Sequence, residues 1–103
     1  MRVLKIEPGK APITINIENT LESLQGQVGG YIEILTFSVA VAVVMDRDHK
    51  EKDKPYNLRL FDDNLLGVLL IAGRNGEDLC DIGDEDAKWW NQWWRTLRWG
   101  DGR

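Results

Sequence analysis

The chain has 103 residues and a formal net charge of −4, with 43% apolar and 29% charged residues. This length allows one domain that buries about two-thirds of its unfolded surface, enough for a core without metal or disulfides. The composition excludes a disordered chain, and the negative charge disfavours non-specific binding to nucleic acid or acidic membranes. We therefore expect a single domain over residues 1–103.

Cysteine use and apolar run length predict the location of the protein. Cys80 is the only cysteine, so no intramolecular disulfide can form, and we expect its thiol to be a buried small apolar group. The N-terminus lacks the apolar core of a signal peptide, and the longest apolar run, residues 39–45, is too short to span a bilayer. These features predict a cytoplasmic protein with no membrane partner.

Two short strands are expected at the start of the chain. Apolar residues dominate residues 3–6 and alternate with polar residues through 13–17, and Pro8-Gly9 between them marks a turn. The alternation in the second run predicts a strand that buries one face.

A short helix is expected next. Asn19 and Glu22 have the spacing of a capping box, and Gly29-Gly30 would end the helix. Gly26 weakens such a helix by roughly 1 kcal/mol relative to alanine. The helix therefore needs to pack against a sheet.

The middle of the chain predicts two strands and a charged loop. Residues 31–37 indicate a half-exposed strand, and residues 39–45 a central strand buried on both faces, with Ser38 between them. Residues 46–54, here called the charged loop, are eight charged residues and His49. We expect this loop to be solvated, with His49 at the surface rather than in a metal site.

The last part of the chain predicts a hairpin and a second helix. Strands over 68–72 and 78–81 flank Asn75-Gly76, a strong signal for a tight turn. A helix over 84–97 begins with acidic residues and carries its basic residues later, as the helix dipole favours. The expected fold is α+β: a small, mainly antiparallel sheet with two helices packed on it, the C-terminal one rich in tryptophan.

Tryptophans are concentrated on the expected C-terminal helix. One broad helical face holds Trp89, Trp90, Trp93, Trp94 and Leu97. Two interpretations remain open: the face is a lid on the core, or it is wider than a small sheet can cover and lies partly in solvent. A mixed arrangement would bury Trp90, Trp93 and Leu97 and leave Trp89, Trp94 or Trp99 at the rim.

Exposed tryptophans beside arginines are typical of binding hot spots. The expected partner-binding residues are Trp89, Trp93, Trp94, Arg95 and Trp99. Such a surface would also suit a homodimer. Stacking of Trp99 on nucleic-acid bases is the weaker interpretation because the chain is acidic overall.

The segment after the charged loop also has two interpretations. In the structural one, Asn57 caps a turn and Arg59 pairs with an acid such as Asp62. In the functional one, Asn57 and Arg59 form a recognition surface for an anion or a protein partner.

No residue pattern in the sequence predicts catalysis. Neither Ser23 nor Ser38 lies in a nucleophile elbow, and no glycine-rich phosphate loop is present. We therefore expect a protein that is not an enzyme and that holds neither a metal nor a cofactor.

Four segments carry a resemblance to a known family. They are MRVLKIEPGK, IENTLESLQGQVGGYIEILTF, KPYNLRL and IAGRNGEDLCDI. The chain resembles a family of small uncharacterised proteins, a domain of unknown function, encoded by phages, plasmids and conjugative elements of Gram-positive bacteria. The stretch from residue 17 to residue 34 is the most specific, and Pro55, Asn57 and Arg59 match a family pattern that follows an acidic loop.

The resemblance implies an accessory protein of a mobile element, located in the cytoplasm of the bacterial host. Our leading hypothesis is that the protein binds a host protein, for example a component of a defence system. The alternative is a small-ligand or nucleotide-binding protein in which Asn57 and Arg59 hold a phosphate.

Overall fold

The computed structural model describes residues 1–99, with Trp99 described by its backbone alone. Its strands, in chain order, are β1 (Arg2–Ile6), β2 (Ile13–Asn16), β3 (Ile32–Ser38), β4 (Val41–Asp46), β5 (Tyr56–Leu60), β6 (Asp63–Leu66), β7 (Leu69–Asn75) and β8 (Asp78–Cys80). The helices are α1 (Leu21–Val28) and α2 (Asp84–Trp99).

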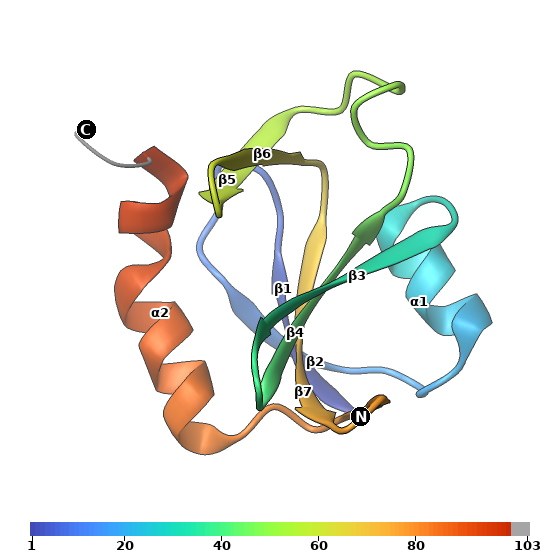
Figure 1. Cartoon of the computed structure of the whole chain (residues 1–103), viewed down its shortest axis with the longest axis vertical. Coiled ribbons are helices and arrows are strands. Elements are labelled where there is room, and N and C mark those ends of the chain that lie inside the picture. The colour runs from blue at the N-terminus through green and yellow to red at the C-terminus, as the bar shows by residue number, and fades with distance from the viewer. Residues whose placement is uncertain (100–103) are drawn as a thin grey trace.

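All the strand pairs in this part of the chain are antiparallel. The main sheet has the order β2-β1-β7-β4-β3, with β8 paired to β7, while β5 and β6 form a separate hairpin (Figure 1). The expected α+β fold, an antiparallel sheet with two helices of which the second is rich in tryptophan, is confirmed.

Strand β4 lies inside the main sheet, between β7 and the edge strand β3, and is buried along its whole length. Its run of β-branched and small apolar residues is what a strand covered on both faces requires. The strand begins at Val41 rather than at residue 39, because Val39 lies in the turn and the Ser38 Oγ accepts a hydrogen bond from the Ala40 N–H at 3.3 Å.

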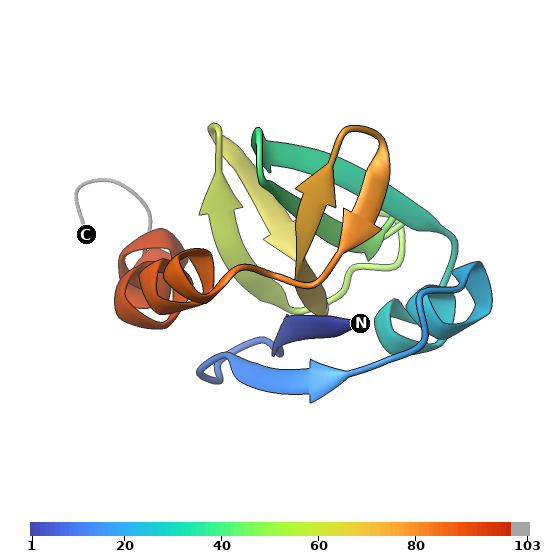
Figure 2. The ribbon, with the colours of Figure 1, turned by 90° about the horizontal axis from the view of Figure 1, so that it is seen from below.

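The two faces of the sheet bury two separate apolar clusters. One cluster packs under α1 and contains Val3, Leu24, Val28, Val44, Leu70 and Ala72. The other lies between the sheet, the β5–β6 hairpin and α2, and includes Trp90. Figure 2 shows α1 and α2 at opposite ends of the molecule with the strands between them.

Helix α1 has a different N-cap from the one expected. Thr20 is the cap, and its side chain accepts a hydrogen bond from the Ser23 N–H at 3.2 Å. Asn19 instead donates its side-chain amide to the Leu79 carbonyl at 3.0 Å, so it connects the helix entrance to β8 and cannot cap. The helix ends at Gly29 with a φ of 83°, as the double glycine predicted.

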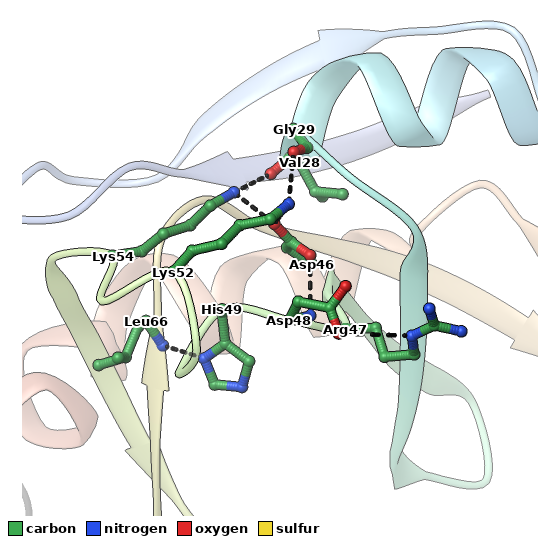
Figure 3. A network of polar contacts seen from close by, with 9 residues as sticks. All are labelled: Val28, Gly29, Asp46, Arg47, Asp48, His49, Lys52, Lys54 and Leu66. Carbon is green, nitrogen blue, oxygen red and sulfur yellow. Dashed lines mark hydrogen bonds and ion pairs between the residues drawn. The ribbon is translucent and has the colours of Figure 1, made fainter.

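The expectation that the charged loop is fully solvated is wrong at Asp46. This carboxylate is 1% exposed, and the amines of Lys52 and Lys54 both lie 2.7 Å from its Oδ2. The same two amines donate to the carbonyls of Gly29 and Val28 at 3.1 and 2.8 Å (Figure 3). The loop therefore supplies the cations that the C-terminus of α1 lacks.

These contacts determine the ionisation of Asp46. Burial alone would raise its pKa, but hydrogen bonds from Lys52 and Lys54 outweigh burial and hold the pKa well below its usual range. The close approach depends on Gly30, because a Cβ there would lie 2.5 Å from the Lys52 amine and 2.7 Å from an Asp46 oxygen. Asp46 is therefore ionised in the folded protein at neutral pH.

Two further expectations about polar residues are wrong. His49 is buried, and its Nδ1 accepts a hydrogen bond from the Leu66 N–H at 2.9 Å, which joins the charged loop to β6. Cys80 is exposed rather than buried, because the strand alternation of β8 turns Leu79 toward the core and Cys80 away from it.

We predict that Asp46→Asn lowers the free energy of unfolding at neutral pH by about 2 kcal/mol, because it removes the charge of a buried acceptor that two partly exposed lysines contact. The native pKa is lower than the ~3.9 of an unfolded aspartate, so the stabilisation is present above that value and is lost as the pH falls below it. Urea unfolding at neutral pH and at about pH 3 measures the difference.

The matched control for this prediction is Glu51→Gln, which neutralises an exposed acid on the same loop. A loss of stability as large in the control as in Asp46→Asn, or a difference between wild type and Asp46→Asn that does not shrink in acid, would contradict the assignment.

Candidate functional site

The face of α2 that packs on the core consists of residues spaced about one helical turn apart. Trp90 is buried in the core against Phe37, and Trp94 is 8% exposed. Leu97 and Ala87 extend the same face and pack on the core. These contacts fix the rotation of the helix about its own axis.

Two tryptophans of α2 remain at the surface. Trp89 is 39% and Trp93 44% exposed, and they lie one helical turn apart. The expectation that Trp93 is inside and Trp94 at the rim is therefore wrong, because Trp94 is buried and Trp93 is exposed. A helix rotates 100° per residue, so the rotation that buries Trp90 and Trp94 turns Trp93 toward solvent.

One of these exposed rings, Trp89, joins a cluster built around Phe37 of β3. The ring centre of Phe37 lies 5.4 Å from that of Trp89, 4.9 Å from that of Trp90 and 6.0 Å from that of Phe61. Phe61 is 65% exposed. We call Phe37, Phe61, Trp89 and Trp93 the aromatic patch; it brings together the end of β3, the tip of the β5–β6 hairpin and one side of α2.

The hairpin tip holds Phe61 in an unfavourable backbone conformation. Leu60 pairs with Asp63, which leaves a two-residue turn in which Phe61 and Asp62 have φ values of 50° and 61°. Such turns favour Asn-Gly, because a left-handed conformation costs an ordinary residue about 1–2 kcal/mol. An exposed phenylalanine at this position is worse for stability than several alternatives, which points to a role in binding.

Acidic side chains surround the aromatic patch. Asp62 follows Phe61 directly, and Glu85 and Asp86 lie one turn before Trp89 on α2. Asp62 and Glu85 are exposed and have long ion pairs with Arg59 and Lys88, at 3.8 and 3.6 Å. Exposed pairs of this kind are weak and leave the carboxylates available to a partner.

The residues expected to bind a partner do not form one surface. Trp89 and Trp93 come together, whereas Trp94 is buried and the Arg95 guanidinium lies over its ring at 5.7 Å. Arg95 is two residues beyond Trp93 and thus projects from nearly the opposite side of the helix. The side chain of Trp99 lies outside the described part of the chain.

Of the two residues expected to bind a ligand, Asn57 is buried and Arg59 lies at the surface. Asn57 is 1% exposed, and its side-chain amide donates to the carbonyls of Ile6 and Gly67, both at 2.8 Å. It ties β5 to the end of β1 and is not accessible to a ligand. Arg59 lies at the surface, within 3.8 Å of Asp62, as the structural interpretation of this segment proposed.

Other hollows of the surface lie away from the patch. One of about 420 Å³ is lined by Gly9, Ala11, Trp94, Arg95 and Arg98. Within residues 1–99, no group of three or more histidine, cysteine or acidic residues could hold a metal ion. None of the helices in that same stretch has the length and apolar character needed to cross a membrane.

Sequence reasoning missed Phe61 and Phe37. The polar run Asp62-Asp63-Asn64 predicts a turn at those residues, whereas the observed turn begins one residue earlier and therefore carries Phe61 at its tip. A phenylalanine directly before an acidic turn was the available signal. Phe37 was assigned to a half-exposed strand, but the alternation of residues along that strand does not predict its contacts with Trp89 and Trp90.

Comparisons with known proteins identify a family. The model of a family described as Domain of unknown function (DUF3846) matches residues 1–95 of the chain. Neither the curated proteins nor the solved structures contain a match to the chain.

We predict that Trp94→Ala lowers the free energy of unfolding by about 3 kcal/mol, because it leaves a cavity beneath α2. The neighbouring Trp93→Ala should lower it by about 1 kcal/mol or less, because that ring is half in solvent. Chemical denaturation of both variants measures the difference. Equal losses, or a greater loss for Trp93→Ala, would contradict the observed rotation of α2.

We predict that Phe61→Asn raises the free energy of unfolding by about 1 kcal/mol, because asparagine tolerates the left-handed backbone of this turn. Thermal denaturation measures the change. The control is Tyr31→Asn, which replaces an equally exposed aromatic ring at a position without positive φ. A Phe61→Asn protein that melts below wild type would show that the ring contributes more to folding than the turn costs.

Proposed function

This chain belongs to the DUF3846 family, and we propose that it acts without catalysis, by binding another protein through the aromatic patch. The proposal rests on one observation: Phe61 and Trp89 are exposed and both contact Phe37, and Trp93 is exposed one helical turn beyond Trp89. Trp and other aromatic anchors dominate the energetics of protein interfaces, and monomeric proteins rarely leave such rings clustered in solvent.

The geometry of the patch supports a binding role over a purely structural one. Trp90 and Phe37 already close the core, so Trp89, Trp93 and Phe61 are not needed to seal it. Smaller or polar residues at these three places would keep the fold and improve solubility. Rigid rings on a helix and a hairpin also lose little conformational entropy on binding, which favours affinity.

The source of the partner follows from the family resemblance described above. We propose that the protein is encoded by a phage, plasmid or conjugative element and acts in the cytoplasm of its bacterial host. A host protein is then the expected partner, and a component of a defence system is the leading example. The small size of the chain suits an accessory role of this kind.

The nucleotide-binding alternative is weaker and is not proposed. It required Asn57 and Arg59 to hold a phosphate together, but the amide of Asn57 is buried and donates to two backbone carbonyls. An anion near Arg59 would also meet the carboxylate of Asp62.

Site-directed photo-crosslinking in living cells tests the proposed function. A benzophenone amino acid replaces Phe61, or, as the matched control, Leu21, an exposed apolar residue on α1. In the bacterium that carries the gene, we expect a discrete adduct with one protein from position 61 only. The adduct should disappear when Trp93→Ser is added.

Two outcomes would overturn the proposal. One is the same set of adducts from positions 61 and 21, which would mean non-specific contact. The other is an adduct from position 61 that Trp93→Ser leaves unchanged, which would separate any binding from the aromatic patch.

A further inference from the structure

Strand β3 is a free edge of the main sheet. It stands last in the strand order, and among the described strands only β4 pairs with it (Figures 1 and 2). An edge strand presents a row of unpaired N–H and C=O groups that can template another strand. With seven residues, β3 is long enough for several such bonds.

The pairing register identifies the peptide groups at this edge. The Arg47 N–H donates to the Tyr31 carbonyl at 2.7 Å, so these two residues form a hydrogen-bonded pair. In an antiparallel ladder such pairs alternate with non-hydrogen-bonded ones. The register therefore turns the N–H and C=O groups of Ile32, Ile34 and Thr36 away from β4 and toward the open edge.

Two of the common devices that prevent strand addition are missing from this edge. Natural edge strands are protected by proline, lysine or bulges. β3 contains neither proline nor lysine, and its one irregularity lies at its far end, between Thr36 and Ser38. Ile34 is half exposed beside the open peptide groups.

The edge and the aromatic patch form one continuous surface. Leu35 and Phe37 lie on the face of β3 that packs toward α2, and Phe37 is the centre of the patch. Glu33 lies on the same face and pairs with Met45 of that core. A strand added to β3 would therefore place alternate side chains over Glu33, Leu35 and Phe37.

We propose that the partner of this protein binds as an extended segment that pairs with the edge of β3 and inserts an apolar side chain into the aromatic patch. This inference rests on the proposed function and specifies its binding mode. The segment carries a lysine or arginine opposite Glu33 and an apolar residue two or four positions away, on the same face. Main-chain bonds provide affinity, and the patch provides selectivity.

Charge favours a basic segment over a second copy of this chain. Asp62 follows Phe61 of the patch, Glu85 and Asp86 lie one turn before Trp89, and Glu33 is the only charged residue of β3. A second β3 has no cation to place opposite Glu33. Pairing with a second β3 would thus bring no cation to Glu33, whereas a basic segment would place one there.

Displayed random dodecapeptides provide the probe. Panning on the immobilised protein, followed by synthesis of the enriched sequences, yields peptides for affinity measurements. Ile34→Pro removes one outward N–H at the edge without removing a bond to β4. The matched control is Thr14→Pro on β2, the opposite edge strand, where the Ile17 N–H bond to the Met1 carbonyl places the Thr14 N–H outward by the same alternation.

We expect the enriched peptides to combine lysine or arginine with an apolar residue and to lose affinity about tenfold or more on Ile34→Pro but not on Thr14→Pro. We also expect peptide addition to the wild-type protein to slow amide exchange at Ile32, Ile34 and Thr36, a readout that does not depend on either variant folding.

Peptides that bind Ile34→Pro as tightly as wild type and leave those three amides unprotected would overturn the strand pairing. If Trp93→Ser abolishes their binding in that case, the proposed function stands and only the binding mode is wrong. If Trp93→Ser also has no effect, both proposals fail. Protection of the β3 amides in the protein alone, with a dimeric mass, would identify a second copy as the occupant and overturn the partner segment.

Discussion

The packing of Trp90 against Phe37 joins helix α2, the main sheet and the β5–β6 hairpin in one apolar cluster. Phe37 lies at the register shift near the end of β3, Trp90 lies on α2, and the β5–β6 hairpin packs beside them. At the other end of the helix, the Tyr56 hydroxyl donates to the Arg98 carbonyl at 2.5 Å and fixes α2 against β5. Within residues 1–99 the indole N–H of Trp90 is buried without a hydrogen bond, a cost of about 1–3 kcal/mol that the ring packing offsets. Because Trp90 faces the core, the rotation of α2 leaves Trp89 and Trp93 at the surface.

Much of the fold could be predicted because its signals are local. The apolar run of β4 and the Asn75-Gly76 turn each require only neighbouring residues to be interpreted. Asp46 and His49 could not be predicted, because the lysines that pair with Asp46 lie several positions along the loop and the N–H that donates to His49 belongs to Leu66 of β6. A loop of alternating charge is usually solvated, and nothing in the order of its residues shows that one carboxylate is buried by two lysines.

The sequence identified the tryptophans of α2 as candidate site residues, but not which of them are exposed. The sequence left open whether the tryptophans of α2 exceed what the sheet can cover, and the structure shows that Trp89 and Trp93 are exposed. Which rings lie inside depends on Phe37, a residue more than fifty positions earlier, so Trp93 and Trp94 were assigned the wrong way round. Phe61 was missed because the polar residues after it mark the turn one position too late, and a positive φ at a phenylalanine is not expected from its residue type.

The bonds from Lys52 and Lys54 to the end of α1 restrict how this protein can change over evolutionary time. The helix has no basic residue in its last turn and contains a central glycine. The two cations that bond its C-terminal carbonyls come from a segment more than twenty residues downstream. A loop that looks replaceable is therefore coupled to a helix it does not adjoin in sequence. Relatives that lengthen or neutralise this loop need a compensating charge or a stronger helix former on α1, so the two segments should vary together rather than separately.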